Sequence, residues 1–315
     1  MGDALAALGW QVHEQLRRTV RSLAEVVEDA GPGWSARTPS LPLVHSLNRL
    51  HVPARSGPGG AGESLGLAGE ILSLPGESLG LADEILAMAD EHQADLGYRH
   101  VVVEDERTAR QLVASLGSAG WRVERLVLMV LDTVAAGAGE DRSGEDWSGE
   151  ARSGEARSGD RELFAEPVSE LTAGEAAELM RRWAVEDRLE VVPGVIEQLA
   201  VYNDREGRLW NERALGIRQD GAPVALTKYR SDDGVAWVED VYTVPEARGR
   251  GHARTLVTRA AGAAVAAGHE LVFIVADDED WPKELYRAIG FRPAARSWTF
   301  HKDLGAAGRV GVRAS

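Results

Sequence analysis

The stretch from Trp237 to Leu256 (WVEDVYTVPEARGRGHARTL) constrains the fold of this chain more than any other. It combines an apolar strand pattern, a proline at position 245, a loop of arginine and glycine, and a helix that begins near Gly251. A strand that leads through glycines into a helix directs backbone N–H groups at the space before the helix, where the helix dipole adds partial positive charge. The pattern therefore predicts an anion site, most often for a phosphate. The alternative is an ordinary strand–turn–helix that binds nothing.

The glycine loop itself, Arg248–Ala253, fits the pattern Arg/Gln-x-x-Gly-x-Gly/Ala. The same pattern occurs at Arg259–Ala264, but that copy lies inside the expected helix and follows no strand. A dinucleotide-binding G-x-G-x-x-G is excluded because Arg254 stands at its last glycine, and no Gly-Lys-Ser/Thr of a P-loop exists. In its context the loop resembles the acyl-CoA-binding loop of the GNAT superfamily of N-acyltransferases.

Composition limits the classes of partner. A chain of 315 residues predicts about two domains. It has no 18-residue apolar run, no basic region at its N-terminus and no cysteine, so we expect a cytoplasmic protein without disulfides or thiolate metal sites. The net charge of −15 argues against nucleic acid and anionic membrane as partners. The eight histidines show no metal spacing, so we expect no metal, and a monomer or homodimer that acts on small molecules.

The N-terminal part predicts a helix over 4–30, followed by an extended segment or short helix over 42–52. Residues 62–72 and 76–86 are near-identical copies (GESLGLAGEIL and GESLGLADEIL), which indicate a surface loop expanded by duplication. The second copy leads into a helix expected over 79–96.

A strand at 100–104, a helix at 108–116 and a strand at 121–131 come next. This strand–helix–strand order, with a glycine and an aromatic residue before the last strand, returns near the C-terminus. We interpret it as a divergent duplication, although chance convergence of two α/β units would give the same pattern. The expected domains are a degenerate unit at 1–134, a flexible Ser/Gly/Glu linker at 135–160, a catalytic unit at 161–304 and a flexible tail at 305–315. The first unit lacks the glycine-loop pattern, so no intact coenzyme site is expected there.

The C-terminal part predicts a first strand at 163–168, a helix capped by Thr172, and a second helix that Pro193 opens. Asp220-Gly221 indicates a hairpin between strands at 213–218 and 224–230. After the opening stretch we expect a buried strand at 271–275, a helix at 282–289 and a last strand at 298–301.

Two further features strengthen the resemblance to the GNAT superfamily. Residues 285–291 (LYRAIGF) resemble its Leu-Tyr-x-x-x-Gly-Phe signature, and Glu239-Asp240 stand where several polyamine- and amino-sugar-acetylating members carry an acidic pair. The resemblance implies an α/β (α+β) GNAT fold, a mixed central sheet flanked by helices, here joined to a second GNAT-like N-terminal domain. It also implies acetyl-CoA as co-substrate.

The resemblance assigns coenzyme contacts to the end of the strand and to the glycine loop. Backbone amides of the loop would hold the pyrophosphate, and the strand edge would pair with the pantetheine amides, provided that the neighbouring strands part there. The residues concerned are Val241, Tyr242, Thr243, Arg248, Gly249, Arg250, Gly251, His252, Ala253 and Arg254.

For catalysis we expect Glu239 to take the proton of the attacking amine and Tyr286 to protonate the departing thiolate. Strand alternation would send Glu239 and Asp240 to opposite faces, so that one of them is well aimed. The alternatives are a structural ion pair for the carboxylates and a packing role for Tyr286.

The acceptor pocket is expected along the two helices after the first strand, with Trp183, Glu186 and Tyr202, because carboxylates beside aromatic rings suit a cationic amine. These residues would equally suit solvated helix faces. The sequence thus predicts direct N-acetyl transfer from acetyl-CoA to a primary amine of a small, cationic molecule or peptide. The alternative is an acyl-CoA-binding sensor, or a protein that sequesters a ligand, without turnover.

Overall fold

The computed structural model describes residues 2–54, 77–131, 168–187, 189 and 192–305. The duplicated loop copy at 62–72, the linker at 135–160, residues 163–167 of the expected first strand and all but the first residue of the tail lie outside these ranges. None of the helices within the described ranges is long and apolar enough to cross a membrane.

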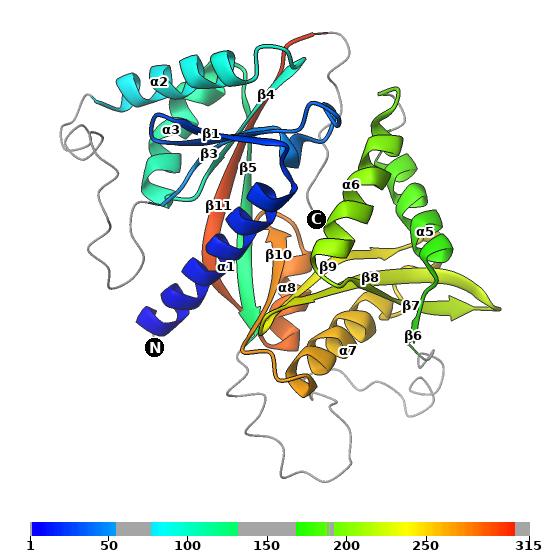
Figure 1. The fold of residues 1–315 in the computed structure, drawn as a ribbon. Coiled ribbons are helices and arrows are strands. Elements are labelled where there is room, and N and C mark those ends of the chain that lie inside the picture. The colour runs from blue at the N-terminus through cyan, green and yellow to red at the C-terminus, as the bar shows by residue number, and fades with distance from the viewer. Residues whose placement is uncertain (1, 55–76, 132–167, 188, 190–191, 306–315) are drawn as a thin grey trace.

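A single mixed sheet of eleven strands organises the molecule, and helices cover both of its faces (Figure 1). The helices are α1 (Gly2–Leu23), α2 (Glu77–His92), α3 (Glu106–Ser118), α5 (Ala173–Glu186), α6 (Val195–Leu209), α7 (His252–Ala266) and α8 (Pro282–Ile289), with 3-10 turns η1 (His45–Leu47) and η3 (Pro245–Ala247). The strands are β1 (Val26–Ala30), β2 (Gly33–Arg37), β3 (Arg49–Val52), β4 (Tyr98–Val103), β5 (Arg122–Leu131), β6 (Ser169–Glu170), β7 (Arg213–Gln219), β8 (Ala222–Asp232), β9 (Val235–Thr243), β10 (Leu271–Asp277) and β11 (Phe291–Asp303). From α5 onward the expected order of elements in the C-terminal half is confirmed, and the short strand β6 follows the range 163–168 expected for the first strand.

The order of strands across the sheet is β1-β2-β3-β4-β11-β5-β10-β9-β8-β7-β6. The last strand of the N-terminal half, β5, pairs with β10, and the last strand of the C-terminal half, β11, pairs with β4. The two exchanged strands also pair with each other at the centre of the sheet. On either side the parallel pair β3–β4 matches the parallel pair β9–β10. The two halves therefore repeat one arrangement and interlock through their last strands.

Side-chain alternation along these strands separates two faces. Val127, Met129 and Leu131 of β5 pack in a cluster with α7 and α8, whereas Leu128 and Val130 pack with α1. The helices α2 and α3 cover the N-terminal half on the same face as α7 and α8, through residues such as Val101 and Phe300. The opposite face is covered by α1, α5 and α6, and this is the face that forms the site.

Two expectations about the N-terminal half are corrected. The helix expected over 4–30 ends at Leu23, and Val26–Ala30 form a strand that pairs with Gly33–Arg37. The apolar spacing continued a helical period past Leu23. However, the β-branched Val26 and Val27 favour a strand, and the turn at Gly31 allows that strand to form a hairpin. The last strand, expected over 298–301, begins at Phe291. Its early residues gain pairing from β5, a partner more than 150 residues distant in sequence.

The exchange of last strands predicts that neither half folds alone. A chain of residues 161–315 lacks β5, whose residues 127–131 are almost fully buried. Losing the burial of five such side chains costs roughly 10 kcal/mol, as much as the whole stability of many domains. We expect residues 161–315 expressed alone to show no cooperative thermal unfolding. Residues 1–134 co-expressed with them should restore it and co-purify as a one-to-one complex.

A matched control is the intact chain carried through the same purification. A fragment 161–315 that unfolds cooperatively as a monomer would contradict the exchange.

Candidate active site

The glycine loop joins β9 to α7 with two residues of left-handed backbone. Gly249 has φ 75° and Gly251 has φ 80°, a region that glycine enters without a steric penalty. Gly251 is the N-cap of α7 and supplies no side-chain oxygen, so the first N–H groups of the helix are left for another partner. A Cβ at either glycine would meet no protein atom within 4 Å. The mouth of the helix is therefore open, and its N–H groups and dipole suit an anion.

Beside this loop, β9 and β10 part. Their parallel pairing ends at Val238 and Ile274, although β9 continues to Thr243 and β10 to Asp277. Beyond that point β10 pairs on its other edge with β5. The edge of β9 over Val241–Thr243 thus faces a gap between strands, which is the condition that the expected coenzyme pairing required.

The charged residues of the loop contact neighbouring elements. Arg248 forms an ion pair with Glu186 and donates from Nε to the carbonyl oxygen of Thr243 at 3.0 Å. Arg250 donates to Gln219 Oε1 at 3.0 Å. His252 is buried at the first position of α7 and contacts Gln219 at 3.3 Å between ring and amide nitrogens, and Ala253 and Arg254 follow in the same turn. These contacts fix the loop against α5 and β7.

Glu239 and Asp240 project to the same face of the sheet, so the prediction of opposite faces was wrong. The β8–β9 register shifts between Leu226 and Lys228, which places a bulge on β9, and Asp240 adopts φ 53° there. A bulge inserts one extra residue and resets the alternation of side chains. Both carboxylates consequently line one cavity, and Val241 returns to the opposite face.

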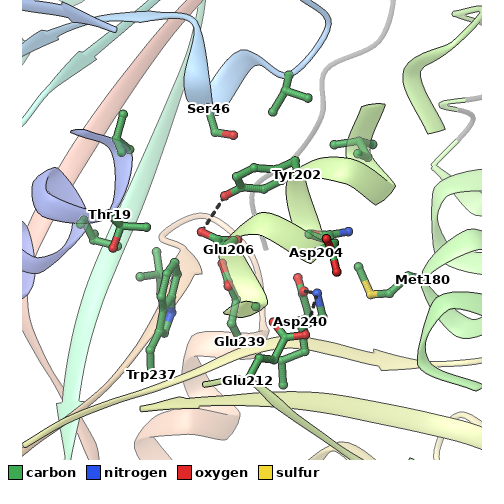
Figure 2. Close-up of a pocket in the computed structure, with 18 of the residues that line it drawn as sticks. Thr19, Ser46, Met180, Tyr202, Asp204, Glu206, Glu212, Trp237, Glu239 and Asp240 are labelled. Atoms are coloured by element: carbon green, nitrogen blue, oxygen red, sulfur yellow. Dashed lines mark hydrogen bonds and ion pairs between the residues drawn. The ribbon is translucent and has the colours of Figure 1, made fainter. Parts of the chain in front are cut away.

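The two carboxylates belong to a cluster around two buried cations of β8 (Figure 2 shows its acidic members). Arg230, which is fully buried, pairs with Glu239, with Glu206 at 3.0 Å and with Glu212 at 2.7 Å. Lys228 pairs with Asp240 at 2.8 Å. Four carboxylates therefore share two cations. Of these six residues the sequence analysis singled out only Glu239 and Asp240, for which it also considered a structural ion pair.

The polar groups of α6 complete the cluster. Tyr202 donates its hydroxyl to Glu206 Oε1 at 2.7 Å (Figure 2). Burial raises the pKa of Glu206, against the opposing effect of Arg230. Burial also raises the pKa of Tyr202 well above its usual value, and the adjacent Glu206 adds to this. Tyr202 thus remains a hydrogen-bond donor to the carboxylate at neutral pH.

The cluster forms one wall of a cavity of about 970 Å³ that both halves of the chain line. Nine carboxylate side chains and five arginine or lysine side chains line it, so the wall is negative overall. Trp183 and Tyr202, which were predicted for the acceptor pocket, line this cavity together with Trp237. The N-terminal half contributes residues of α1, η1, β3, β4 and β5. Because the cavity lies over the exchanged strands, the order of elements in the sequence does not predict that the N-terminal half lines it.

Two predicted site residues lie apart from this cavity. Glu186 is not among its lining residues and instead holds Arg248 and accepts from the Tyr242 hydroxyl at 3.1 Å, so its assignment to the acceptor pocket stays a prediction. Tyr286 is only 6% exposed and packs with Ile289 and Phe291 on the α7–α8 face. Burial raises the pKa of Tyr286. Glu239 and Tyr286 therefore lie on opposite faces of the sheet.

Known proteins resemble this chain in sequence over one segment and in fold over both halves. Residues 177–291 match the model of the acetyltransferase (GNAT) family. No curated protein matches the chain. A conserved protein of unknown function from Staphylococcus epidermidis ATCC 12228 has a similar structure, with a TM-score of 0.52, 15% identity, and coverage of 88% of this chain and 93% of that one. At this identity the likeness establishes a shared fold over both halves.

Two further structures are titled as GCN5-related N-acetyltransferases. The protein from Kribbella flavida has a TM-score of 0.49 and 18% identity, and the match covers 92% of this chain and 93% of that one. The protein from Sphaerobacter thermophilus has a TM-score of 0.47 and 16% identity, with coverage of 72% and 69%. The family assignment rests on the family model, whose match spans α5 to the start of β11 and includes the glycine loop, the acidic pair and Tyr286. Residues 177–291 thus form a domain that matches the acetyltransferase (GNAT) family.

Proposed function

We propose that the protein transfers an acetyl group from acetyl-CoA directly to a primary amine of a small, cationic molecule. The observation that carries this proposal is the acidic cavity, which reaches Glu239 and Asp240 where β9 parts from β10 beside the open glycine loop. A cavity wall with more carboxylates than cations lowers the free energy of a bound ammonium group. The aromatic rings of Trp183 and Trp237 also line the cavity, and the face of such a ring attracts a cation.

For the coenzyme, we assign the pyrophosphate to the backbone N–H groups of residues 249–253 at the mouth of α7. The pantetheine arm then runs along the free edge of Val241–Thr243, with its amides taking the place of a neighbouring strand. Arg248 and Arg250 border this path, although both already contact protein groups. We therefore assign both arginines two roles: they hold the loop in its open conformation and add positive charge beside the coenzyme.

For the chemistry, the amine nitrogen attacks the thioester carbonyl, the carbon–sulfur bond breaks, and the thiolate of coenzyme A leaves. We assign Glu239 as the base that takes the proton of the amine, directly or through water. Arg230 holds Oε2 of Glu239, so Oε1 is the atom that accepts the proton. Tyr286 donates a proton to the thiolate from the other face of the sheet. Asp240, held by Lys228, helps to bind the ammonium form.

The two halves then divide the work. We propose that 161–304 is the catalytic unit and carries the coenzyme site, while 1–134 is a degenerate copy that supplies one side of the acceptor cavity and, through β5, a strand of the catalytic sheet. This assignment explains how the first half functions without a glycine loop of its own.

The base assignment predicts a large kinetic effect for Glu239→Gln. Thiol release from acetyl-CoA, measured over polyamines, aminoglycosides, amino acids and peptides, identifies the acceptor. With that acceptor Glu239→Gln should lower kcat by roughly 10²–10⁴-fold, because the amine then lacks its base. The matched control is Glu170→Gln, a change to an exposed carboxylate on the same cavity that pairs with Arg213, and it should leave kcat within a few-fold.

A Glu239→Gln enzyme with normal kcat and lowered thermal stability would instead assign Glu239 to a structural ion pair with Arg230. Binding of acetyl-CoA without thiol release for any acceptor would favour the sensor alternative.

The coenzyme assignment predicts that Gly251→Trp abolishes acetyl-CoA binding. The indole would fill the open space before α7, where the pyrophosphate is assigned. Gly268→Trp is a matched control, because Gly268 also has φ 80° and open space around it but lies at the other end of α7. Isothermal titration should show loss of binding in the first variant and unchanged affinity in the second. Equal affinity in both variants would place the coenzyme elsewhere.

The proton-donor assignment predicts that Tyr286→Phe lowers kcat much more than it weakens acetyl-CoA binding, since only the hydroxyl is removed. Tyr229→Phe is the control, because Tyr229 is another buried phenol in the same core cluster. Steady-state kinetics and coenzyme titration on both variants give the comparison. If kcat and coenzyme affinity fall together in Tyr286→Phe, the residue serves packing alone.

A further inference from the structure

Three histidines from distant parts of the chain lie together on the cavity face of the N-terminal half. His100 of β4 and His301 of β11 are directly opposite in the antiparallel pair, and His45 of η1 lies over them. The ring centroids of His45 and His301 are 4.7 Å apart, and each of the other two pairs is separated by 5.9 Å. One nitrogen of each ring can be chosen so that all three lie within 4.8 Å of one another.

This spacing is close to that of three imidazoles on one metal ion. Zinc–nitrogen bonds of about 2.0–2.1 Å put two tetrahedral nitrogen ligands about 3.4 Å apart, with ring centroids at about 5 Å. The observed centroid separations bracket that value. Small rotations of the side chains therefore bring the three nitrogens onto one ion without moving the strands.

The surroundings orient two of the rings. Nε2 of His301 lies 2.8 Å from Oδ1 of Asp303, which leaves its Nδ1 for a ligand. A carboxylate on the outer nitrogen of a metal-bound histidine is the usual second contact of such sites. In His100, Nδ1 is buried and has no hydrogen-bond partner among the described residues. A buried ring nitrogen without a partner carries a cost that a bound ion would remove.

The protonation states also suit a ligand set. Burial lowers the pKa of His45 to about 3, and the neighbouring His301 and Arg122 contribute. Burial, with the two other histidines, also holds the pKa of His100 well below its usual value. Burial lowers the pKa of His301, although Asp303 opposes this. All three rings are neutral at pH 7, as metal ligation requires.

We propose that His45, His100 and His301 form a binding site for one divalent transition-metal ion, with zinc as the best match. Neutral imidazoles suit zinc, copper and nickel, whereas magnesium and calcium require oxygen ligands. Three protein ligands leave a fourth position open for water or another ligand. His45 and His100 line the cavity, so that position can be reached from it. The proposal does not depend on the proposed acetyl transfer, although the histidines and the Arg230 cluster border the same cavity.

The competing explanation is an aromatic stack. Tyr98 lies 3.8 Å from His45 between ring centroids and 5.7 Å from His301, so the rings pack as a group. Phenylalanine would pack equally well without burying a nitrogen that lacks a partner. The sequence spacing concealed the site, because the three histidines are separated by 55 and 201 residues. The β4–β11 pairing brings His100 and His301 together, and the packing of η1 adds His45.

The test uses the full chain without a polyhistidine tag, stripped with a chelator. Cobalt(II) titration should give the visible absorption bands of a low-coordinate nitrogen site at one ion per chain. Zinc, titrated in competition with a chromophoric chelator, should displace the cobalt and raise the thermal unfolding temperature. A wild-type chain that takes up neither ion at a modest excess overturns the proposal, and this result needs no variant.

Variants locate the site. His100→Asn and His301→Asn should abolish the cobalt bands, and Asp303→Asn should weaken zinc binding by roughly 10- to 100-fold through loss of the second contact. Two matched controls are His51→Asn, which removes a cavity histidine paired with Glu104, and His269→Asn, outside the cavity. Both should bind as the wild type does. Unchanged binding in His100→Asn and His301→Asn, or its loss in His51→Asn alone, overturns the assignment. If His100→Asn does not fold, Asp303→Asn still decides, because Asp303 is partly exposed.

Discussion

The pairing of β5 with β10, and of β11 with β4, is the constraint on which the rest of the structure depends. Each half of the chain completes the sheet of the other, so the strands at the centre carry the core on both faces. The same exchange sets one continuous face of sheet beneath α1, α5 and α6. The cavity over the exchanged strands is lined by side chains of both halves, so neither half could form it by itself.

Within that cavity, Arg230 determines the electrostatics. A buried guanidinium without partners would be strongly destabilising, and Glu206, Glu212 and Glu239 each pair with it. With Asp240 on Lys228, the carboxylates still outnumber the cations. The cluster is therefore stable as built but retains negative charge at the surface of the cavity. The cationic acceptor proposed above would compensate that charge, and deletion of Arg230 would leave several carboxylates without a counterion.

What the sequence predicted, and what it did not, follows from the range of the interactions. Thr172 caps α5 as predicted and does so in a capping box with Glu175. Asp220 and Gly221 turn between β7 and β8, and α8 spans Pro282–Ile289, both as predicted, because each feature depends on neighbouring residues. The strand exchange, the partners of Glu239 and the histidine group depend on contacts across many residues. The bulge at Asp240 is a local feature, yet its sequence resembles an ordinary strand, and only the unequal pairing of β8 and β9 reveals it.

The divergence of the two halves follows from the same architecture. The N-terminal half keeps the strand order and the parallel pair, but its sequence lacks the glycine-loop pattern, so we propose no coenzyme site there. Its cavity face is instead filled with ionisable groups, such as Glu104 with His51 at 2.7 Å and Arg17 at 3.0 Å. Burial of such groups is tolerated only where every charge has a partner. Under the division of work proposed above, a copy without a coenzyme site was free to reshape its face, while the need for β5 in the sheet of the other half prevented its loss.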